Sequence, residues 1–165
     1  MPSLAPTLAR AVAPAPPPPP PAAPPPRAIL KIREARPGDA KGLAALIGAE
    51  ALGTRLAALR KAGEPPLVAE EAGTILGCAT FHRIPLLQEA APLGRISLLL
   101  VAPEARRRGI GRALVEEVEA RLAEAGCRRI EAMAEIELAA APDFFRRLGW
   151  SRAAYRYVRE FGTEA

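Results

Sequence analysis

The amino-acid sequence predicts a domain of the α/β class (α+β), because strand-like and helix-like segments alternate along its 165 residues. Residues 94–103 form a nearly continuous apolar run, which is typical of a buried central strand. Apolar residues then recur at every fourth position over 106–125, which is the spacing of a helix with one buried face. Residues 67–84 have the pattern of a hairpin. These three features together predict one domain in which helices pack on a sheet.

The predicted elements follow the order strand, two helices, three strands, helix, strand, helix, strand. Apolar residues at 29–32 indicate the first strand, and the turn residues Pro37, Gly38 and Asp39 precede a helix. The apolar face of that helix is made of Leu43, Leu46 and Ile47. Residues 53–63 predict the second helix.

The hairpin consists of two strands at 67–71 and 74–84, joined by a turn at Ala72 and Gly73. A loop after Pro85 leads to the buried central strand, and a helix over 106–125 follows it. The apolar positions of that helix are Ile110, Leu114, Val118 and Leu122.

The last elements lie in the final forty residues. Gly126 ends the long helix, and residues 127–136 resume as a strand. Residues 142–150 predict a short helix, and residues 151–161 predict the last strand.

The first 27 residues contain most of the 19 prolines and no acidic residue. Proline lacks an N–H group and fixes φ, so such a segment favours an extended rod over a helix or a sheet. We therefore expect a disordered tail at 1–27 and a globular domain at 28–165. A transit peptide and a docking segment for a proline-binding module are the alternatives for the tail.

Positive charges outnumber negative ones, with 23 Lys and Arg against 18 Asp and Glu, but arginines and glutamates are interleaved through the globular part. Interleaved charge is typical of a solvated surface, so we expect no nucleic-acid partner. No apolar run approaches the ~20 residues of a membrane-spanning helix, and we expect a soluble, cytoplasmic protein with no membrane contact. Cys78 and Cys127 lack metal-ligand spacing, so reduced thiols and no metal are expected.

The sequence RRRGIG at 106–111 joins the central strand to the long helix. The first N–H groups of a helix have no intrahelical partners and, with the helix dipole, favour an anion; glycine lets a phosphate approach the backbone. A tight turn without a ligand is the alternative. The dinucleotide fingerprint G-x-G-x-x-G fails because its third glycine is replaced by Leu114, and no Gly-Lys-Ser/Thr occurs.

The stretch LLLVAPEARRRGIGRALVEEVEARLAEAG resembles motif A of the GNAT superfamily of acyl-CoA N-acyltransferases, with Arg106, Gly109 and Gly111 at the three defining places. The opening segment, the hairpin and APDFFRRLGW, which resembles motif B, extend the resemblance to residues 29–161. The resemblance implies a mixed, mostly antiparallel sheet of six to seven strands, flanked by about four helices and splayed between the fourth and fifth strands.

The resemblance also implies that acetyl-CoA is the cosubstrate. Its pyrophosphate would lie on the backbone N–H groups of the glycine turn, and its pantetheine would pair with the edge of the central strand. An N–H group at that edge would face the thioester oxygen. The residues implicated are Leu99, Leu100, Val101, Arg106, Arg107, Arg108, Gly109, Ile110, Gly111 and Arg112, with Phe145 packed beside CoA or in the core.

The catalytic groups of the family are less evident. Phe145 stands where relatives commonly carry an acidic tyrosine, which Tyr155, Tyr157 or solvent would have to replace. Arg95 and Met133 stand where different relatives carry a glutamate base, and Leu138 replaces a frequent asparagine.

Glu135 and Glu137 are therefore our preferred candidates for the base that removes a proton from the amine. The other candidates are Glu70, Glu71, Ser97 and His82, each of which could instead be a solvated or structural group.

The resemblance implies an N-acetyltransferase that modifies a primary amine by direct attack, without an acyl-enzyme. The alternative is a catalytically silent acyl-CoA-binding module that regulates a partner. The amine could belong to a small metabolite, an antibiotic or a protein, and a homodimer is an open alternative because dimers are common among relatives.

Overall fold

The computed structural model describes residues 29–133, 141–154 and 158–159. In this part of the chain, five strands form one sheet in the order β1-β2-β3-β4-β5. The first four strands pair antiparallel, and β4 pairs with β5 in parallel. The strands are β1 (Lys31–Glu34), β2 (Leu67–Glu71), β3 (Thr74–Ile84), β4 (Leu93–Val101) and β5 (Arg129–Ala132). The mixed, mostly antiparallel sheet predicted from the sequence is confirmed.

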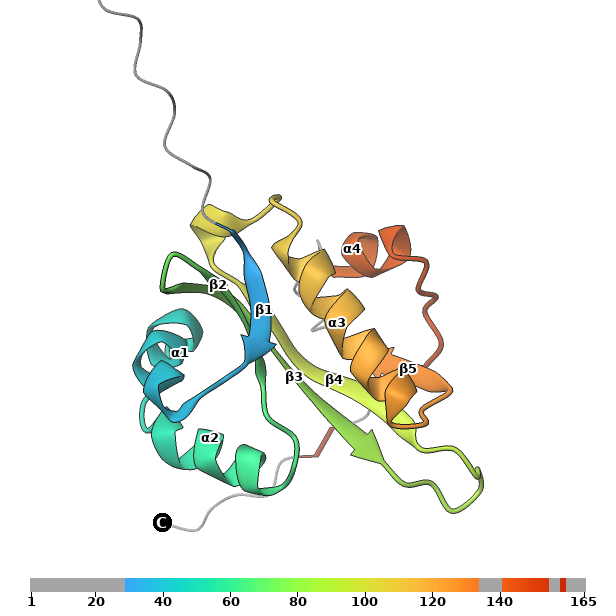
Figure 1. The fold of residues 1–165 in the computed structure, drawn as a ribbon. Helices are drawn as coiled ribbons and strands as arrows, with labels where there is room; N and C mark the ends of the chain where they lie inside the picture. The colour runs from blue at the N-terminus through green and yellow to red at the C-terminus, as the bar shows by residue number, and fades with distance from the viewer. Residues whose placement is uncertain (1–28, 134–140, 155–157, 160–165) are drawn as a thin grey trace, which may run out of the picture.

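Helices cover both faces of the sheet. Figure 1 shows α1 and α2 on one side and α3, with α4 beside it, on the other. The helices are α1 (Ala40–Ile47), α2 (Leu52–Lys61), α3 (Ile110–Glu124) and α4 (Ala141–Arg147), and two 3₁₀ turns occupy Pro37–Asp39 (η1) and Pro103–Ala105 (η2). None of the helices in these ranges has the length and apolar character needed to span a bilayer.

The four-residue period predicted for the long helix sets the core. Ile110, Leu114, Val118 and Leu122 are at most 2% exposed, and they pack on the sheet face that carries Leu67 and Ile96. The other face carries Val68 and Cys78 under α1 and α2. Burial raises the pKa of the Cys78 thiol to about 11, so it stays protonated at neutral pH. Both cysteines are free.

The long helix begins later than predicted, at Ile110 instead of residue 106. Its sequence is helix-compatible from Glu104 onward, but Pro103–Ala105 forms a 3₁₀ turn, and Arg107 and Gly109 have φ values of 60° and 83°. These positive φ values are incompatible with a right-handed helix. The residues between the strand and the helix are therefore a loop.

The strand predicted at 151–161 is wrong over residues 151–154 and 158–159, which are not in a strand. The remainder of that segment lies outside the described residues, as do the predicted tail at 1–27 and residues 134–136 of the fifth predicted strand. The described sheet accordingly has five strands, whereas six to seven were expected.

The hairpin and the central strand have the irregularities that matter for the site. Ala72 and Gly73 have φ values of 49° and 80°, as a two-residue type I′ turn requires. Between β3 and β4 the register shifts, with Thr80 opposite Leu98 and Phe81 opposite Ile96. Ser97 is the extra residue of this β-bulge on β4, and bulges re-aim side chains.

An ionic cluster fastens β1 to the start of α1. The Arg33 guanidinium donates to both carboxylate oxygens of Asp39 at 2.6 and 2.9 Å, and to Glu70 Oε2 at 2.7 Å. Asp39 Oδ2 also accepts the Arg36 N–H at 2.6 Å. The hydrogen bonds from Arg33 hold the pKa of the Asp39 carboxyl below its usual range.

We expect Asp39→Asn to lower the free energy of unfolding by about 1–2 kcal/mol at neutral pH, because an amide cannot keep both charge-assisted bonds. A carboxyl whose pKa is lowered on folding stabilises the fold above its unfolded pKa, and this contribution is lost as pH falls through the folded pKa. The difference between wild type and variant should thus shrink in acid. Urea unfolding at several pH values measures it.

Asp143→Asn is the matched control, because Asp143 and its partner Arg146 have side chains that are 58% and 77% exposed. Its effect should stay below about 0.5 kcal/mol. A destabilisation by Asp39→Asn that persists unchanged into acid would contradict the ionic explanation.

Candidate active site

The loop before α3 presents backbone N–H groups at the end of β4. The first helical hydrogen bond of α3 runs from the Ala113 N–H to the Gly109 carbonyl, at 3.0 Å. The N–H groups of Ile110, Gly111 and Arg112 precede this bond and have no carbonyl one turn earlier to accept them. Gly109, in the left-handed conformation, caps the helix without a side chain. The result is a helix N-terminus with an open backbone surface.

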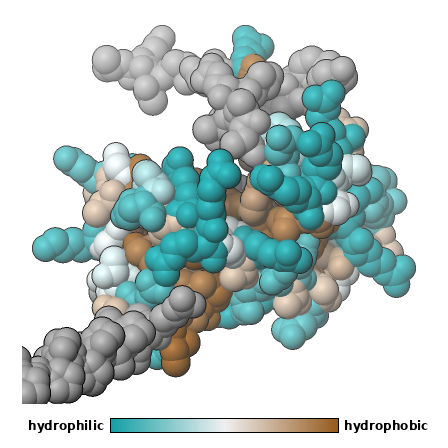
Figure 2. Space-filling view, turned by 90° about the horizontal axis from the view of Figure 1, so that it is seen from above, coloured by the Kyte–Doolittle hydropathy of each residue, from teal (hydrophilic) through white to brown (hydrophobic). Residues whose placement is uncertain are grey.

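Arginine side chains surround this loop. Arg106 Nε donates to the Val101 carbonyl at 3.2 Å, Arg108 pairs with Glu71 on β2 at 2.6 Å, and Arg112 pairs with Glu116 at 2.7 Å. The Glu71 carboxylate raises the pKa of Arg108. Figure 2 looks down on the end of the molecule where this loop lies in Figure 1, and it shows mainly hydrophilic side chains with apolar ones between them.

β4 and β5 separate before β4 reaches this loop. Their last paired residues are Ile96 and Ala132, and over 97–101 the described residues pair β4 with β3 alone. The Ala102 N–H donates to the Leu76 carbonyl at 2.8 Å, which sets the alternation of the antiparallel ladder.

By that alternation, Leu100 directs its backbone groups toward β3, whereas Leu99 and Val101 direct theirs toward the side that β5 has left. The Val101 carbonyl, which accepts from Arg106, is on that side. Over 97–101, β4 therefore has backbone groups on this edge that no other described strand pairs, although the Val101 carbonyl accepts from the Arg106 guanidinium.

An aromatic group closes the side of the loop that faces α4. A Cβ added to Gly111 would lie 3.4 Å from the Phe144 ring and 3.6 Å from Val101, so both side chains border the space beside this glycine. Phe145, the aromatic residue proposed from the sequence, packs against Phe144 and Trp150 at ring-centroid distances of 5.2 and 5.1 Å.

A chain of four polar side chains lies where β4 and β5 separate. Glu64 Oε2 is 2.6 Å from His82 Nδ1, His82 Nε2 is 2.8 Å from Ser97 Oγ, and Ser97 Oγ is 2.8 Å from Thr80 Oγ1. We call these residues, Glu64, His82, Ser97 and Thr80, the His82 chain. The structure thus brings together two residues proposed separately from the sequence, His82 and Ser97, and adds Glu64, which the sequence analysis missed.

The other predicted catalytic residues have different surroundings. Glu70 pairs with Arg33 and Glu71 pairs with Arg108, so both carboxylates are held by arginines. Arg95 pairs with Glu131 across β4 and β5. The preferred bases Glu135 and Glu137, like Leu138, Tyr155 and Tyr157, lie outside the described residues.

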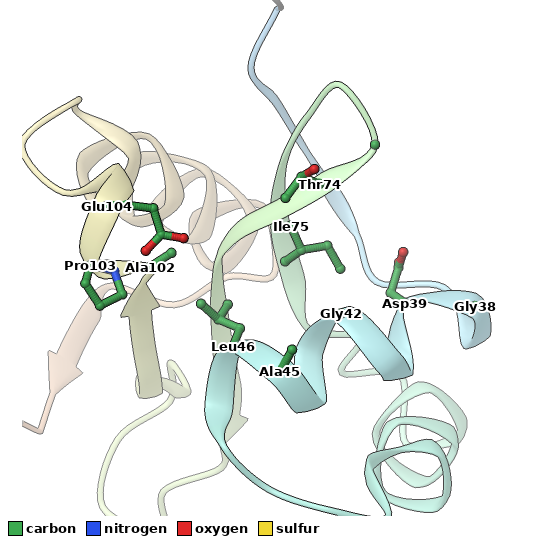
Figure 3. Close-up of a pocket in the computed structure, with 11 residues that line it drawn as sticks. Gly38, Asp39, Gly42, Ala45, Leu46, Thr74, Ile75, Ala102, Pro103 and Glu104 are labelled. Carbon is green, nitrogen blue, oxygen red and sulfur yellow. The ribbon is translucent and has the colours of Figure 1, made fainter.

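A cleft of about 530 Å³ opens between α1, the β2–β3 turn and η2. In Figure 3 the Asp39 and Glu104 side chains come from opposite walls, and Leu46 and Ile75 lie between them. This cleft adjoins the end of β4 at Ala102, whereas Ser97 is five residues back along the chain, where the strands part. It is therefore separate from the His82 chain.

Comparison with known proteins identifies a family model that covers most of the chain. The family model described as "Acetyltransferase (GNAT) family" matches residues 33–150. No protein with a curated description matches the sequence.

Solved structures share the fold. An acetyltransferase from Trypanosoma brucei is 25% identical, with a TM-score of 0.69, and the match covers 81% of this chain and 99% of that one. Glucosamine-6-phosphate N-acetyltransferase from Arabidopsis thaliana is 20% identical (TM-score 0.72, 81% and 99% covered). Ribosomal-protein-alanine N-acetyltransferase from Brucella melitensis biovar Abortus 2308 is 19% identical (TM-score 0.68, 81% and 100% covered).

Proposed function

The chain belongs to the GNAT acetyltransferase family, and we propose that it transfers the acetyl group of acetyl-CoA to a primary amine by direct attack. The observation that carries this proposal is an open helix N-terminus at the end of a strand edge that the described residues leave unpaired over 97–101. A pyrophosphate suits the first feature, and the amides of a pantetheine arm suit the second.

The residues of the loop fit a diphosphate. The N–H groups of residues 107–112 are the donors, and glycines at 109 and 111 keep side chains away from the backbone surface. The Arg107 side chain has no partner among the described residues and remains available as a cation. Phe144 and Phe145 form the apolar border on the α4 side.

The free edge of β4 fits the rest of the cosubstrate. Leu99 and Val101 offer N–H and C=O groups in strand geometry, as an added strand requires. An N–H group of this edge next to the thioester oxygen would stabilise the negative charge that develops there during attack. We assign Leu100 a packing role, because its side chain belongs to the cluster under α1 and α2.

The chemistry needs an amine held against the thioester. Acetyl-CoA supplies the acyl carbon and a thiol leaving group, and the products are an amide and free CoA thiol. Positioning the two reactants contributes most of the acceleration in this proposal. A base must also take a proton from the amine, which is largely protonated at neutral pH.

The test is a panel of amines with acetyl-CoA, in which release of free thiol is followed and the product is identified by mass spectrometry. The panel contains glucosamine 6-phosphate, an aminoglycoside and a peptide with N-terminal alanine, which sample the acceptor classes in the names of the similar structures. A lysine peptide adds the side-chain amine of a protein. A tertiary-amine analogue of each compound is the control, because it cannot form a stable amide.

Thiol release that depends on one primary amine, with the matching acetylated product, is the expected result. Tight binding of CoA without acetylation of any amine would favour the alternative, a regulatory acyl-CoA-binding module. Absence of CoA binding in calorimetry would contradict both.

A further inference from the structure

The His82 chain has the hydrogen-bond geometry of an oriented base. Glu64 accepts two bonds with its two oxygens: Oε1 accepts the Arg83 N–H at 3.2 Å, and Oε2 lies 2.6 Å from His82 Nδ1. A carboxylate can only accept, so the imidazole must donate from Nδ1. In the neutral ring this leaves the lone pair on Nε2, which points at Ser97 Oγ 2.8 Å away.

The His82 chain lies at the place where the amine and the thioester must meet. Ser97 is the bulged residue of β4 and the first residue after the last pair between β4 and β5. Ser97 is four residues before Val101, which lies beside the loop that precedes α3. Four residues of strand span ~13 Å. A cosubstrate that enters along the free edge from the loop therefore reaches the level of Ser97.

The His82 chain is also accessible to solvent. Ser97 is exposed, and the His82 and Glu64 side chains are each 29% exposed. His82 and Thr80 project on the sheet face of Cys78, which α1 and α2 cover farther along. An amine can approach from solvent on this face while the cosubstrate occupies the gap between the strands.

Two arginines lie next to the imidazole, and within the described residues a carboxylate holds the guanidinium of one of them, Arg95. Arg95 on β4 is opposite His82 in the ladder, and its guanidinium is held by Glu131 at 2.5 Å. Arg83 is the next residue on β3, and its N–H binds Glu64. Glu70 is bound to Arg33 and Glu71 is bound to Arg108, so neither carboxylate has the free acceptor lone pair that His82 Nε2 directs at Ser97.

We propose that His82 is the general base of the acetyl transfer, that Ser97 relays the proton to it, and that Glu64 is a positioning residue that fixes the imidazole tautomer. This proposal rests on the proposed function. The ammonium form of the acceptor gives one proton to Ser97 Oγ as the Ser97 hydroxyl proton passes to His82 Nε2. The nitrogen lone pair then forms the C–N bond.

The C–S bond breaks with its electron pair on sulfur, and the second proton lost by the nitrogen ends on the thiolate. His82 then returns its proton to solvent. Ser97 carries a proton in this scheme and never the acetyl group.

The first test uses the fact that His82 is the only histidine of the chain, so its imidazole gives one set of nitrogen resonances. In ¹⁵N-histidine-labelled protein in alkaline buffer, where an imidazole is neutral, Nδ1 should carry the proton and Nε2 should be unprotonated. Glu64→Ala should move the population toward the Nε2–H tautomer. A wild-type ring that is mainly Nε2–H would overturn the assignment without any measurement of activity.

The second test is the pH dependence of kcat with the best amine of the panel. His82→Asn should lower kcat by ~10²–10⁴-fold, with KM for acetyl-CoA unchanged, and should remove the fall in rate that protonation of the imidazole causes in acid. Ser97→Ala should lower kcat, and Glu64→Gln should lower it less while moving the acidic limb of the profile. Glu89→Gln is the matched control, because Glu89, in the loop between β3 and β4, pairs with exposed Arg129 and makes no hydrogen bond to the His82 chain in the described residues.

Three further results would overturn the proposal. The first is a His82→Asn protein that binds CoA normally and keeps the kcat and pH profile of an active wild type, which leaves the proposed function intact. The second is acetylated Ser97 after incubation with acetyl-CoA alone, which would make Ser97 a nucleophile. The third is a wild type that acetylates no amine, which would end the proposed function as well.

Discussion

Gly109→Val should weaken CoA binding about 10- to 100-fold while leaving the protein folded. Gly109 has a φ of 83°, and a β-branched residue in this region is a strong outlier, with strain of about 1–3 kcal/mol. The variant loop should relax toward negative φ, which turns the N–H groups of residues 109–111 away from a common point. Each 1.4 kcal/mol of lost interaction is tenfold in affinity. Isothermal titration calorimetry with CoA measures the change.

Gly126→Val is the control, because Gly126 has nearly the same φ, 86°, just after the opposite end of α3. A Cβ at either glycine has no neighbour within 4 Å, so both substitutions introduce backbone strain without a steric clash. Both variants should lose similar stability, and only Gly109→Val should lose affinity. Equal affinities in the two variants would show that the amides before α3 do not hold the cosubstrate.

The features that the sequence predicted well are those with a local pattern. The burial of Ile110, Leu114, Val118 and Leu122 follows directly from their spacing on one helix. The turn at Ala72 and Gly73 was predictable because a glycine stands between two strand-like runs. The junction before α3 was likewise visible as a glycine-rich turn. Its sequence nevertheless placed the start of the helix four residues too early, because nothing in three consecutive arginines signals the positive φ of Arg107.

The His82 chain could not be predicted, because its members are joined only by the fold. Glu64 precedes β2 and is 18 residues from His82, and Ser97 is a further 15 residues away on β4. The contact depends on the β3–β4 register and on the bulge at Ser97, and a bulge has no sequence signature here. Glu64 had no motif that separates it from a solvated charge, so the sequence analysis favoured the later glutamates.

The two halves of the proposed site depend on one packing interface, and Leu114→Ala should show this by lowering the free energy of unfolding by about 2–5 kcal/mol. Leu114 is 0% exposed in the second turn of α3, and its Cδ1 would be 3.2 Å from a Cβ on Gly77 of β3, so helix and sheet are in close contact there. Removing the side chain leaves a cavity that the surrounding strands cannot fill. Stability of ordinary domains is only about 5–15 kcal/mol, so this is a large share of the total.

Leu87→Ala is the control for Leu114→Ala, because Leu87 is fully exposed in the loop between β3 and β4 and the same atoms are removed. Its effect should be within about 0.5 kcal/mol, as for other surface positions. Chemical denaturation of both variants, with and without CoA, separates stability from binding, because a ligand that binds the folded state alone raises its apparent stability. CoA should stabilise the Leu114→Ala protein as it does wild type if α3 keeps its position. A loss of that stabilisation would mean that the helix carries its N-terminal loop out of place when it loosens, which would make the buried face of α3 a determinant of cosubstrate affinity.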